Sequence, residues 1–210
     1  MNIYNVIILD ESGSMSSIYR STLASINEVL SGIRKNQEDN PGQSHYVTIV
    51  TFEGNGIGGI KTRRDRVPIE SVAPFTEKDY QPGGCTPLYD AMGKTLNNLE
   101  GLIRVEDKVM ATVITDGMEN SSEEYSGRTI KNLVSRLREK GWVLAYIGAN
   151  QDSVEVARDL NIANALDFDA TPAGLEKMRA RYCTAHSRIA KMASSITNLG
   201  RVDDIFEEED

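Results

Sequence analysis

Apolar residues recur along this chain in two patterns, and each pattern predicts a different kind of element. Continuous runs rich in β-branched residues are typical of strands that are buried on both faces of a parallel sheet. Runs of this kind occupy residues 3–9, 46–52, 109–115 and 143–147. Apolar residues at helical spacing predict helices within residues 16–35, 88–99, 130–137, 154–160 and 172–192. Strands and helices therefore alternate along most of the chain.

Two shorter strands complete the predicted sheet. Residues 67–72 form a third apolar run, and a glycine-rich, basic segment too short for a crossover helix joins it to residues 46–52. This connection predicts an antiparallel hairpin. Residues 165–168 predict a short last strand.

Local signals predict where several helices begin. Thr86-Pro87 and Thr171-Pro172 each resemble a helix N-cap followed by proline at the first helical position. Asp152 and Glu155 have the spacing of a capping box.

The alternation of strands and helices predicts an α/β fold. Right-handed βαβ units build a three-layer, doubly wound, Rossmann-like domain with helices on both faces of a mostly parallel sheet and one antiparallel edge strand. We expect one domain over residues 1–200 and a flexible acidic tail over residues 201–210. Ligands of such sheets bind outside the carboxyl ends of the strands, where the strand order reverses.

Composition narrows the classes of partner. The chain has 210 residues, is 40% hydrophobic and carries a formal net charge of -8, which argues against nucleic-acid binding. Its one basic cluster is interpreted as a solvated loop or hairpin edge. The cluster consists of Lys61, Arg63, Arg64 and Arg66.

The sequence favours a cytoplasmic protein without a membrane span. The N-terminal apolar run has no basic region before it and is too short for a signal or a span. Cys85 and Cys183 are the two cysteines of the chain, which is no disulfide framework and fits a reducing compartment.

Oxygen-bearing side chains follow two of the predicted buried strands. Residues 10–14 read Asp-Glu-Ser-Gly-Ser directly after the first strand, and Asp116 follows the strand at 109–115. Thr86 offers a third hydroxyl besides those of Ser12 and Ser14. Two carboxylates and three hydroxyls make a hard all-oxygen site, which suits Mg²⁺ or Mn²⁺ and is poor for Zn²⁺. With only two acids and otherwise neutral hydroxyl donors, a bound dication should attract a further anion at an open position.

This motif resembles the metal-ion-dependent adhesion site of the von Willebrand factor type A family, in its bacterial-type intracellular form. Asp10, Ser12, Ser14, Thr86 and Asp116 fill the five positions of that site. The resemblance implies that the serines bind the ion directly, that the threonine does so directly or through water, and that the acids hold bound waters. It also implies a protein partner that presents a Glu or Asp to the metal, as in adaptor subunits.

Several alternatives compete with a non-catalytic binding module. Asp10 could serve as the nucleophile of a Mg²⁺-dependent phosphohydrolase, but Ser12 stands where such enzymes need an acid. The serines do not form a G-x-S-x-G elbow, and the sequence assigns neither histidine as a base. We interpret His45 as a loop residue and His186 as a helix-surface residue.

Three weaker signals complete the sequence analysis. Gly54, Gly56 and Gly59 satisfy G-x-G-x-x-G without the strand-turn-helix context of a nucleotide site. Cys85 could be a redox-sensitive thiol, but we interpret it as a small, buried packing residue. The acidic tail is interpreted as a solvated segment, with docking into a neighbouring molecule's metal site as the alternative.

Overall fold

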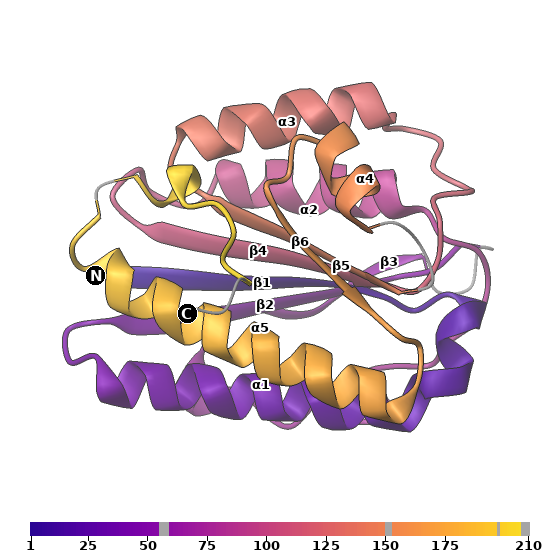
Figure 1. Cartoon of the computed structure of the whole chain (residues 1–210), viewed down its shortest axis with the longest axis horizontal. Coiled ribbons are helices and arrows are strands. Elements are labelled where there is room, and N and C mark those ends of the chain that lie inside the picture. The colour runs from indigo at the N-terminus through magenta and orange to yellow at the C-terminus, as the bar shows by residue number, and fades with distance from the viewer. Residues whose placement is uncertain (55–58, 150–152, 197, 207–210) are drawn as a thin grey trace.

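The central layer of the protein is a sheet whose strands run in the order β3-β2-β1-β4-β5-β6 (Figure 1). The computed structural model describes residues 1–54, 59–149, 153–196 and 198–206. Within this part of the chain, all strand pairs are parallel except the antiparallel pair of β2 and the edge strand β3. The strands are β1 Asn2–Asp10, β2 Ser44–Phe52, β3 Ile60–Pro68, β4 Lys108–Thr115, β5 Val143–Ala149 and β6 Asn164–Phe168.

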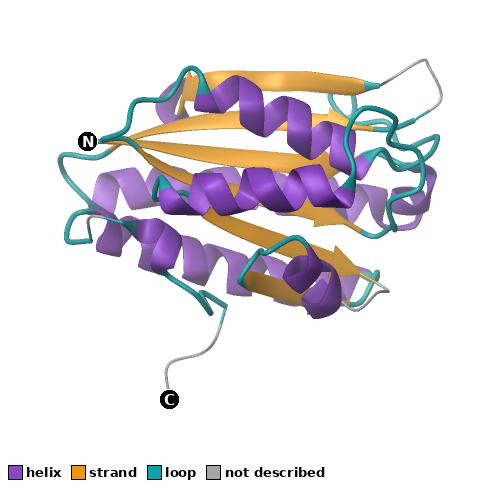
Figure 2. Cartoon of the chain, turned by 90° about the horizontal axis from the view of Figure 1, so that it is seen from above, coloured by secondary structure: helices purple, strands orange, loops and turns teal. Residues whose placement is uncertain are grey.

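Helices cover both faces of this sheet, as the views in Figures 1 and 2 show. On one face lie α1 Tyr19–Asp39 and α5 Pro172–Ala193. On the other face lie α2 Leu88–Glu100, α3 Gly127–Glu139 and α4 Ser153–Asp159. Short 3₁₀ helices span Gly13–Ile18, Ile69–Ser71 and Leu199–Arg201. The predicted three-layer α/β fold with one antiparallel edge strand is therefore confirmed.

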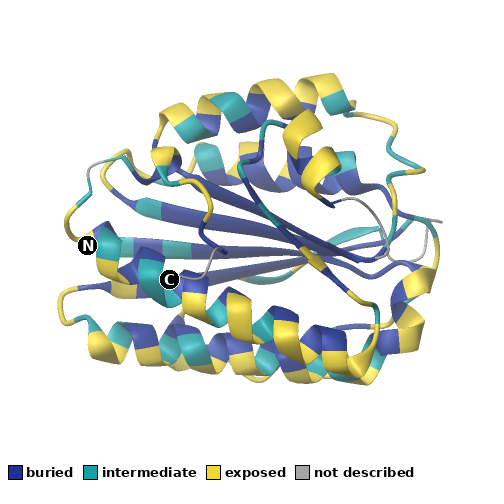
Figure 3. Ribbon diagram, in the orientation of Figure 1, coloured by how far each residue is buried: buried dark blue, intermediate teal, exposed yellow. Residues whose placement is uncertain are grey.

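Burial follows the apolar pattern of the sequence. The middle strands β1, β4 and β5 are buried on both faces, whereas the helices alternate buried and exposed residues along their length (Figure 3). In α3, for example, Ile130, Leu133, Val134 and Leu137 are buried at the spacing of one helix face. No helix in the described part of the chain is long and apolar enough to cross a membrane.

The edge strand begins earlier than the sequence predicts. Residues 67–72 were expected to form it, but β3 spans Ile60–Pro68 and the chain then enters the 3₁₀ helix at Ile69–Ser71. The basic residues between 61 and 66 therefore lie in the strand itself and not in a turn before it. An edge strand needs no continuous apolar run, because charged side chains on an edge also protect it against pairing with other chains.

Of the two predicted Thr-Pro helix starts, one is confirmed and one is wrong. The hydroxyl of Thr171 accepts a 3.0 Å hydrogen bond from Gly174 N, so Thr171 caps α5 as expected. By contrast, α2 begins at Leu88 with Pro87 as its N-cap, so the prediction that Thr86 is the cap is wrong. Asp152 and the residues of the glycine motif between 55 and 58 lie outside the described residues.

Both histidines are buried in one polar network, contrary to their interpretation as loop and surface residues. His45 lies in β2 and is 0% exposed, and His186 on the inner side of α5 is 3% exposed. The ring of His186 bonds to Asn5 Oδ1 at 2.6 Å and accepts from Asn36 Nδ2 at 2.9 Å. His45 Nε2 donates to Gln43 Oε1 at 3.1 Å. We call these five residues the histidine network.

The packed part of the chain extends beyond the predicted domain boundary at residue 200. Ile205 and Phe206 are 1% and 6% exposed and belong to the core beside α5. Ile205 N also donates to the buried Asn164 Oδ1 at 3.1 Å, at the start of β6. Residues 205 and 206 are therefore packed against the domain, and the rest of the predicted tail, residues 207–210, lies outside the described part.

Candidate metal site

The Asp10–Ser14 segment, which we call the metal loop, curls at the carboxyl end of β1. Asp10 Oδ1 accepts a 2.7 Å hydrogen bond from Ser12 N, and the hydroxyls of Ser12 and Ser14 lie 3.1 Å apart. Ser14 Oγ in turn donates to Asp116 Oδ1 at 2.5 Å. Alternate side chains of the loop therefore point to one side, where they meet the acid that follows β4.

The fifth predicted residue, Thr86, is held next to this loop by backbone bonds on both sides. Residues Gly54 and Cys85 exchange two hydrogen bonds of 2.8 and 2.7 Å, and Gly13 N donates to Gly84 O at 3.1 Å. Gly84 has a φ of +70°, and a Cβ there would lie 2.0 Å from Gly54 O, so this close approach requires glycine. The segment before α2 is thus fixed against both β2 and the metal loop.

Gly117 shows that the oxygens converge on one point. A Cβ at this glycine would lie 3.1 Å from Thr86 Oγ1, 3.5 Å from Ser14 Oγ and 3.6 Å from Asp10 Oδ2. Glycine leaves this space free among three oxygens from three separate segments. The structure thus brings all five predicted residues together at the carboxyl edge of the sheet, between β1 and β4, where the strand order reverses.

The two carboxylates of the site are held in surroundings that disfavour their charge. The pKa of Asp10 is raised to about 6, chiefly by burial and to a smaller extent by the nearby Asp116, against hydrogen bonds from Thr115 and Ser12 that lower it. Burial also raises the pKa of Asp116. A bound cation would favour the charged form of both groups, because an opposite charge at short range offsets desolvation.

The donor set fits a hard divalent cation. Among the described residues there is no group of three or more His, Cys, Asp or Glu side chains that could hold a metal. The convergent atoms are hydroxyl and carboxylate oxygens, which Mg²⁺ and Mn²⁺ accept and for which Zn²⁺ has less preference. Ser12 and Thr86 are 0% and 3% exposed, while Ser14 is exposed, so the site opens to solvent on one side.

The same geometry offers little to the enzymatic alternatives. The place two residues after Asp10 holds Ser12, a neutral hydroxyl that lies 3.1 Å from Ser14 Oγ, where a phosphohydrolase of this kind needs an acid. His45 and His186 are buried in the histidine network near the amino ends of β1 and β2, at the other end of the sheet. Neither histidine is placed to activate a serine of the metal loop.

Three residues that support the site carry no role in the sequence interpretation. Thr115 Oγ1 donates to Asp10 Oδ2 at 2.5 Å, and Tyr80 Oη donates to Asp10 O at 2.9 Å. Asn120 Oδ1 accepts from Thr86 N at 2.8 Å, and Asn120 N donates to Thr86 O at 3.2 Å. Thr115 adjoins Asp116 in the sequence, so its position was a usable signal, whereas Tyr80 and Asn120 follow no local pattern.

Comparisons at the level of sequence find no relatives of this chain. No family model matches it. No curated protein matches it either.

Comparisons of the structure find similar folds at low identity. Proximal thread matrix protein 1 of the mussel byssus matches with a TM-score of 0.60 and 17% identity. The match covers 91% of this chain and 46% of the mussel chain. The pilus adhesin SpaC of Lactobacillus rhamnosus GG matches with a TM-score of 0.65 and 12% identity. The match covers 89% of this chain and 30% of the adhesin chain.

A von Willebrand factor type A protein of Catenulispora acidiphila has a TM-score of 0.55 and 16% identity, covering 87% of this chain and 42% of its own. This chain thus spans less than half the length of each of these three neighbours. At such identities the likeness concerns the fold alone: the chain has a von Willebrand factor type A-like fold.

Proposed function

We propose that this protein is a metal-dependent protein-protein interaction module. Its metal-ion-dependent adhesion site consists of Asp10, Ser12, Ser14, Thr86 and Asp116, and it binds Mg²⁺ or Mn²⁺. The observation that carries this proposal is the convergence of three oxygens around the free space at Gly117. The bound ion then captures a Glu or Asp of a partner protein, and no covalent chemistry takes place.

The charge of the site supports an acidic partner group. Asp10 and Asp116 together balance the two charges of a divalent ion, and the hydroxyls are neutral donors, so the ion remains attractive to one more carboxylate. Both acids have pKa values raised by burial, so a cation that keeps them charged is favoured at neutral pH. The ion supplies electrostatic attraction, while the protein side chains orient and partly desolvate it.

The mouth of the site also carries an apolar side chain. Met118 follows Gly117 directly and is 70% exposed. Methionine is flexible and polarisable and is enriched at protein interfaces. We assign Met118 to the rim of the partner-binding surface.

The structural neighbours support an interaction role in general terms. One is described as a pilus adhesin and another as a thread matrix protein. We place this chain in the cytoplasm, because its two cysteines are no disulfide framework and fit a reducing compartment. Its partner is proposed to be a protein rather than a nucleic acid, given the net charge of -8.

A two-step calorimetric titration tests this function. In the first step Mn²⁺ is added to the wild type and to Asp10→Asn, and we expect saturable binding that the variant weakens strongly. In the second step the Mn²⁺-loaded protein receives a short peptide with one glutamate, or the same peptide with glutamine in its place. Metal-dependent preference for the glutamate peptide supports the proposal. Equal binding of both peptides, or binding that survives EDTA, rejects carboxylate capture.

A further inference from the structure

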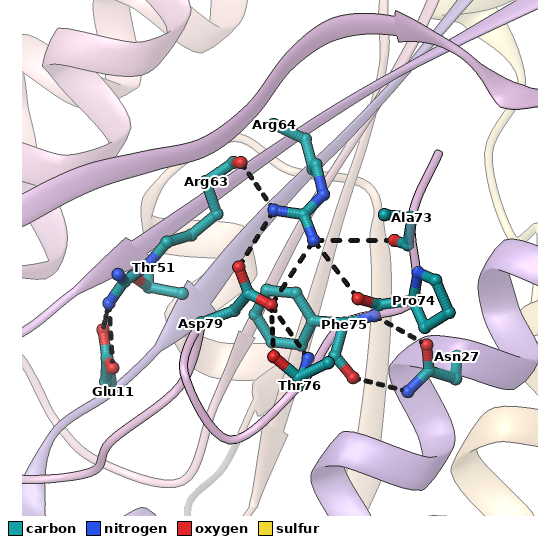
Figure 4. A network of polar contacts seen from close by, with 10 residues as sticks. All are labelled: Glu11, Asn27, Thr51, Arg63, Arg64, Ala73, Pro74, Phe75, Thr76 and Asp79. Carbon is teal, nitrogen blue, oxygen red and sulfur yellow. Dashed lines mark hydrogen bonds and ion pairs between the residues drawn. The ribbon is translucent and has the colours of Figure 1, made fainter. Parts of the chain in front are cut away.

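One residue of the basic cluster on β3, Arg63, contacts the metal loop on the side that faces away from the candidate metal site. The side chain of Arg63 is 17% exposed and reaches Glu11, whose side chain is 3% exposed, within the metal loop. Arg63 Nη2 donates to both carboxylate oxygens of Glu11, at 3.1 and 2.9 Å, and Arg63 Nε donates to the buried Thr51 Oγ1 at 2.8 Å (Figure 4). The Arg63 side chain is therefore mostly shielded from solvent and paired with a buried carboxylate, unlike a solvated edge charge.

Glu11 joins four segments of the chain. Its N–H donates to Phe52 O at 2.8 Å, and its C=O accepts from Gly83 N at 2.8 Å. Its carboxylate accepts from Arg63 and also from Gln81 N. One side chain and its peptide groups thus connect the end of β1 to the end of β2, to β3 and to residues 81–83, which precede Thr86.

The position of Glu11 within the metal loop gives these contacts their importance. Asp10 and Ser12, its two neighbours in sequence, point into the candidate metal site, while the Glu11 side chain extends away from it toward β3. Fixing Glu11 therefore fixes the direction of the residues on both sides. Because Glu11 also holds residues 81 and 83, it sets how closely the metal loop approaches the segment that carries Thr86.

The adjacent Arg64 anchors the preceding part of the same segment. Its guanidinium pairs with Asp79, at 2.9 Å between Nη1 and Oδ1, and donates to the carbonyl of Pro74 at 3.3 Å (Figure 4). Asp79 Oδ2 accepts from Thr76 N at 2.9 Å. The next residue, Tyr80, donates to Asp10 O, so this second ion pair also leads to the metal loop.

We propose that the Arg63–Glu11 ion pair is a positioning device that preforms the candidate metal site by holding the metal loop against β3 and residues 81–83. This inference rests on the proposed function. Breaking a desolvated ion pair leaves an uncompensated buried charge, so the loop must rearrange to hydrate it. The rearranged loop would hold Ser12 and Ser14 away from Thr86, and the cation would have to restore their arrangement on binding.

Arg63→Gln tests this device, with Arg66→Gln as the matched control. Arg66 lies on the same strand, but its partner is the neighbouring Asp65, and both side chains are more than one third exposed, at 35% for Arg66 and 48% for Asp65. Mn²⁺ affinity is measured by titration well below the melting temperature, and the melting temperature is measured separately without metal. We expect Arg63→Gln to weaken Mn²⁺ binding at least tenfold, and Arg66→Gln to stay within twofold of the wild type.

A merely structural role would lower the melting temperature and leave the affinity of the folded protein unchanged, and that result would overturn the proposal. If Arg63→Gln does not fold, Arg63→Lys decides, since lysine keeps the charge but loses the planar fork. We expect it to weaken Mn²⁺ binding at least threefold, and wild-type affinity would reject the device.

A failure of the proposed function is distinguishable from a failure of this inference. If the wild type binds no Mn²⁺, the metal function is wrong, and amide hydrogen exchange of residues 12–15 then tests the positioning alone. Faster exchange in Arg63→Gln than in Arg66→Gln supports a loop held by the ion pair. Equal exchange in the two variants rejects it.

Discussion

Gly117 is a residue at which the proposed metal site can be tested without replacing any of its proposed ligands. A methyl group there would project among Thr86 Oγ1, Ser14 Oγ and Asp10 Oδ2, at 3.1 to 3.6 Å from each. We expect Gly117→Ala to weaken Mn²⁺ binding about tenfold or more, equivalent to at least about 1.4 kcal/mol, because the methyl occupies space that the ion needs. Isothermal titration with Mn²⁺ measures the change.

The control for this substitution is Gly101→Ala. Gly101 follows α2, and the nearest atom to a Cβ there is Asn98 O at 3.7 Å, so the methyl is accommodated. Its Mn²⁺ affinity should equal that of the wild type. An unchanged affinity in Gly117→Ala would mean that the ion, if it binds at all, binds elsewhere.

At the scale of elements, the histidine network ties two helices to two strands. His45 and Asn5 lie on β2 and β1, while Asn36 and His186 lie on α1 and α5. Burial lowers the pKa of His45 to about 4 and that of His186 to about 3, from an ordinary value of 6.5. Both rings are therefore neutral in the folded protein, whereas in the unfolded chain they take up protons below pH 6.5.

This difference predicts a loss of stability in mild acid. A lowered pKa in the folded state means that the stabilisation is fully present above pH 6.5 and is lost as the pH falls toward 3. At pH 5 each histidine should cost about 2 kcal/mol relative to pH 7.5. Urea unfolding of the wild type and of His186→Gln at both pH values isolates one histidine, since other titrating groups are common to both proteins. The wild type should lose about 2 kcal/mol more than the variant, and equal losses would contradict a neutral, buried His186.

The segment after the last 3₁₀ helix is a structural element rather than a free tail. Ile205 is 1% exposed, so Ile205→Ala should lower the free energy of unfolding by about 2–4 kcal/mol, through lost burial and the cavity left behind. Val105→Ala is the control, because Val105 is 89% exposed and should change stability by less than about 0.5 kcal/mol. A loss in Ile205→Ala no larger than that of the control would place residue 205 outside the core.

At the scale of the whole molecule, the apolar pattern was sufficient to predict the layers. Buried parallel strands and amphipathic helices follow from local periodicity, since each must bury one or both faces. The bounds of the edge strand β3 and the burial of the histidines could not be predicted in this way. Lys61 and Arg64 satisfy no strand periodicity, and the burial of His186 depends on partners from β1 and α1, distant in sequence.

The candidate site likewise contains residues that the sequence could predict and residues whose contacts depend on distant parts of the chain. Four of its five residues were predicted because they lie at or directly after the ends of β1 and β4, where the topology brings separate segments together, whereas Thr86 precedes α2 and was included for its hydroxyl and for the family resemblance. The residues that position them were missed, since Arg63 is 52 residues from Glu11 and Asn120 is 34 residues from Thr86. A cluster of arginines has the same composition whether it faces solvent or a buried carboxylate.

Thermal unfolding of the whole protein with and without Mn²⁺ tests the central claim most directly. At a hundredfold excess of Mn²⁺ over its dissociation constant, binding to the native state should add about 2.7 kcal/mol, which raises the melting temperature by about 5–10 °C. The shift should be retained in Ser16→Ala/Ser17→Ala, because both serines are exposed in the following 3₁₀ helix, and lost in Ser12→Ala/Ser14→Ala. A wild-type melting temperature that Mn²⁺ does not change, or an equal shift in the Ser12→Ala/Ser14→Ala protein, would contradict a metal site in the Asp10–Ser14 loop.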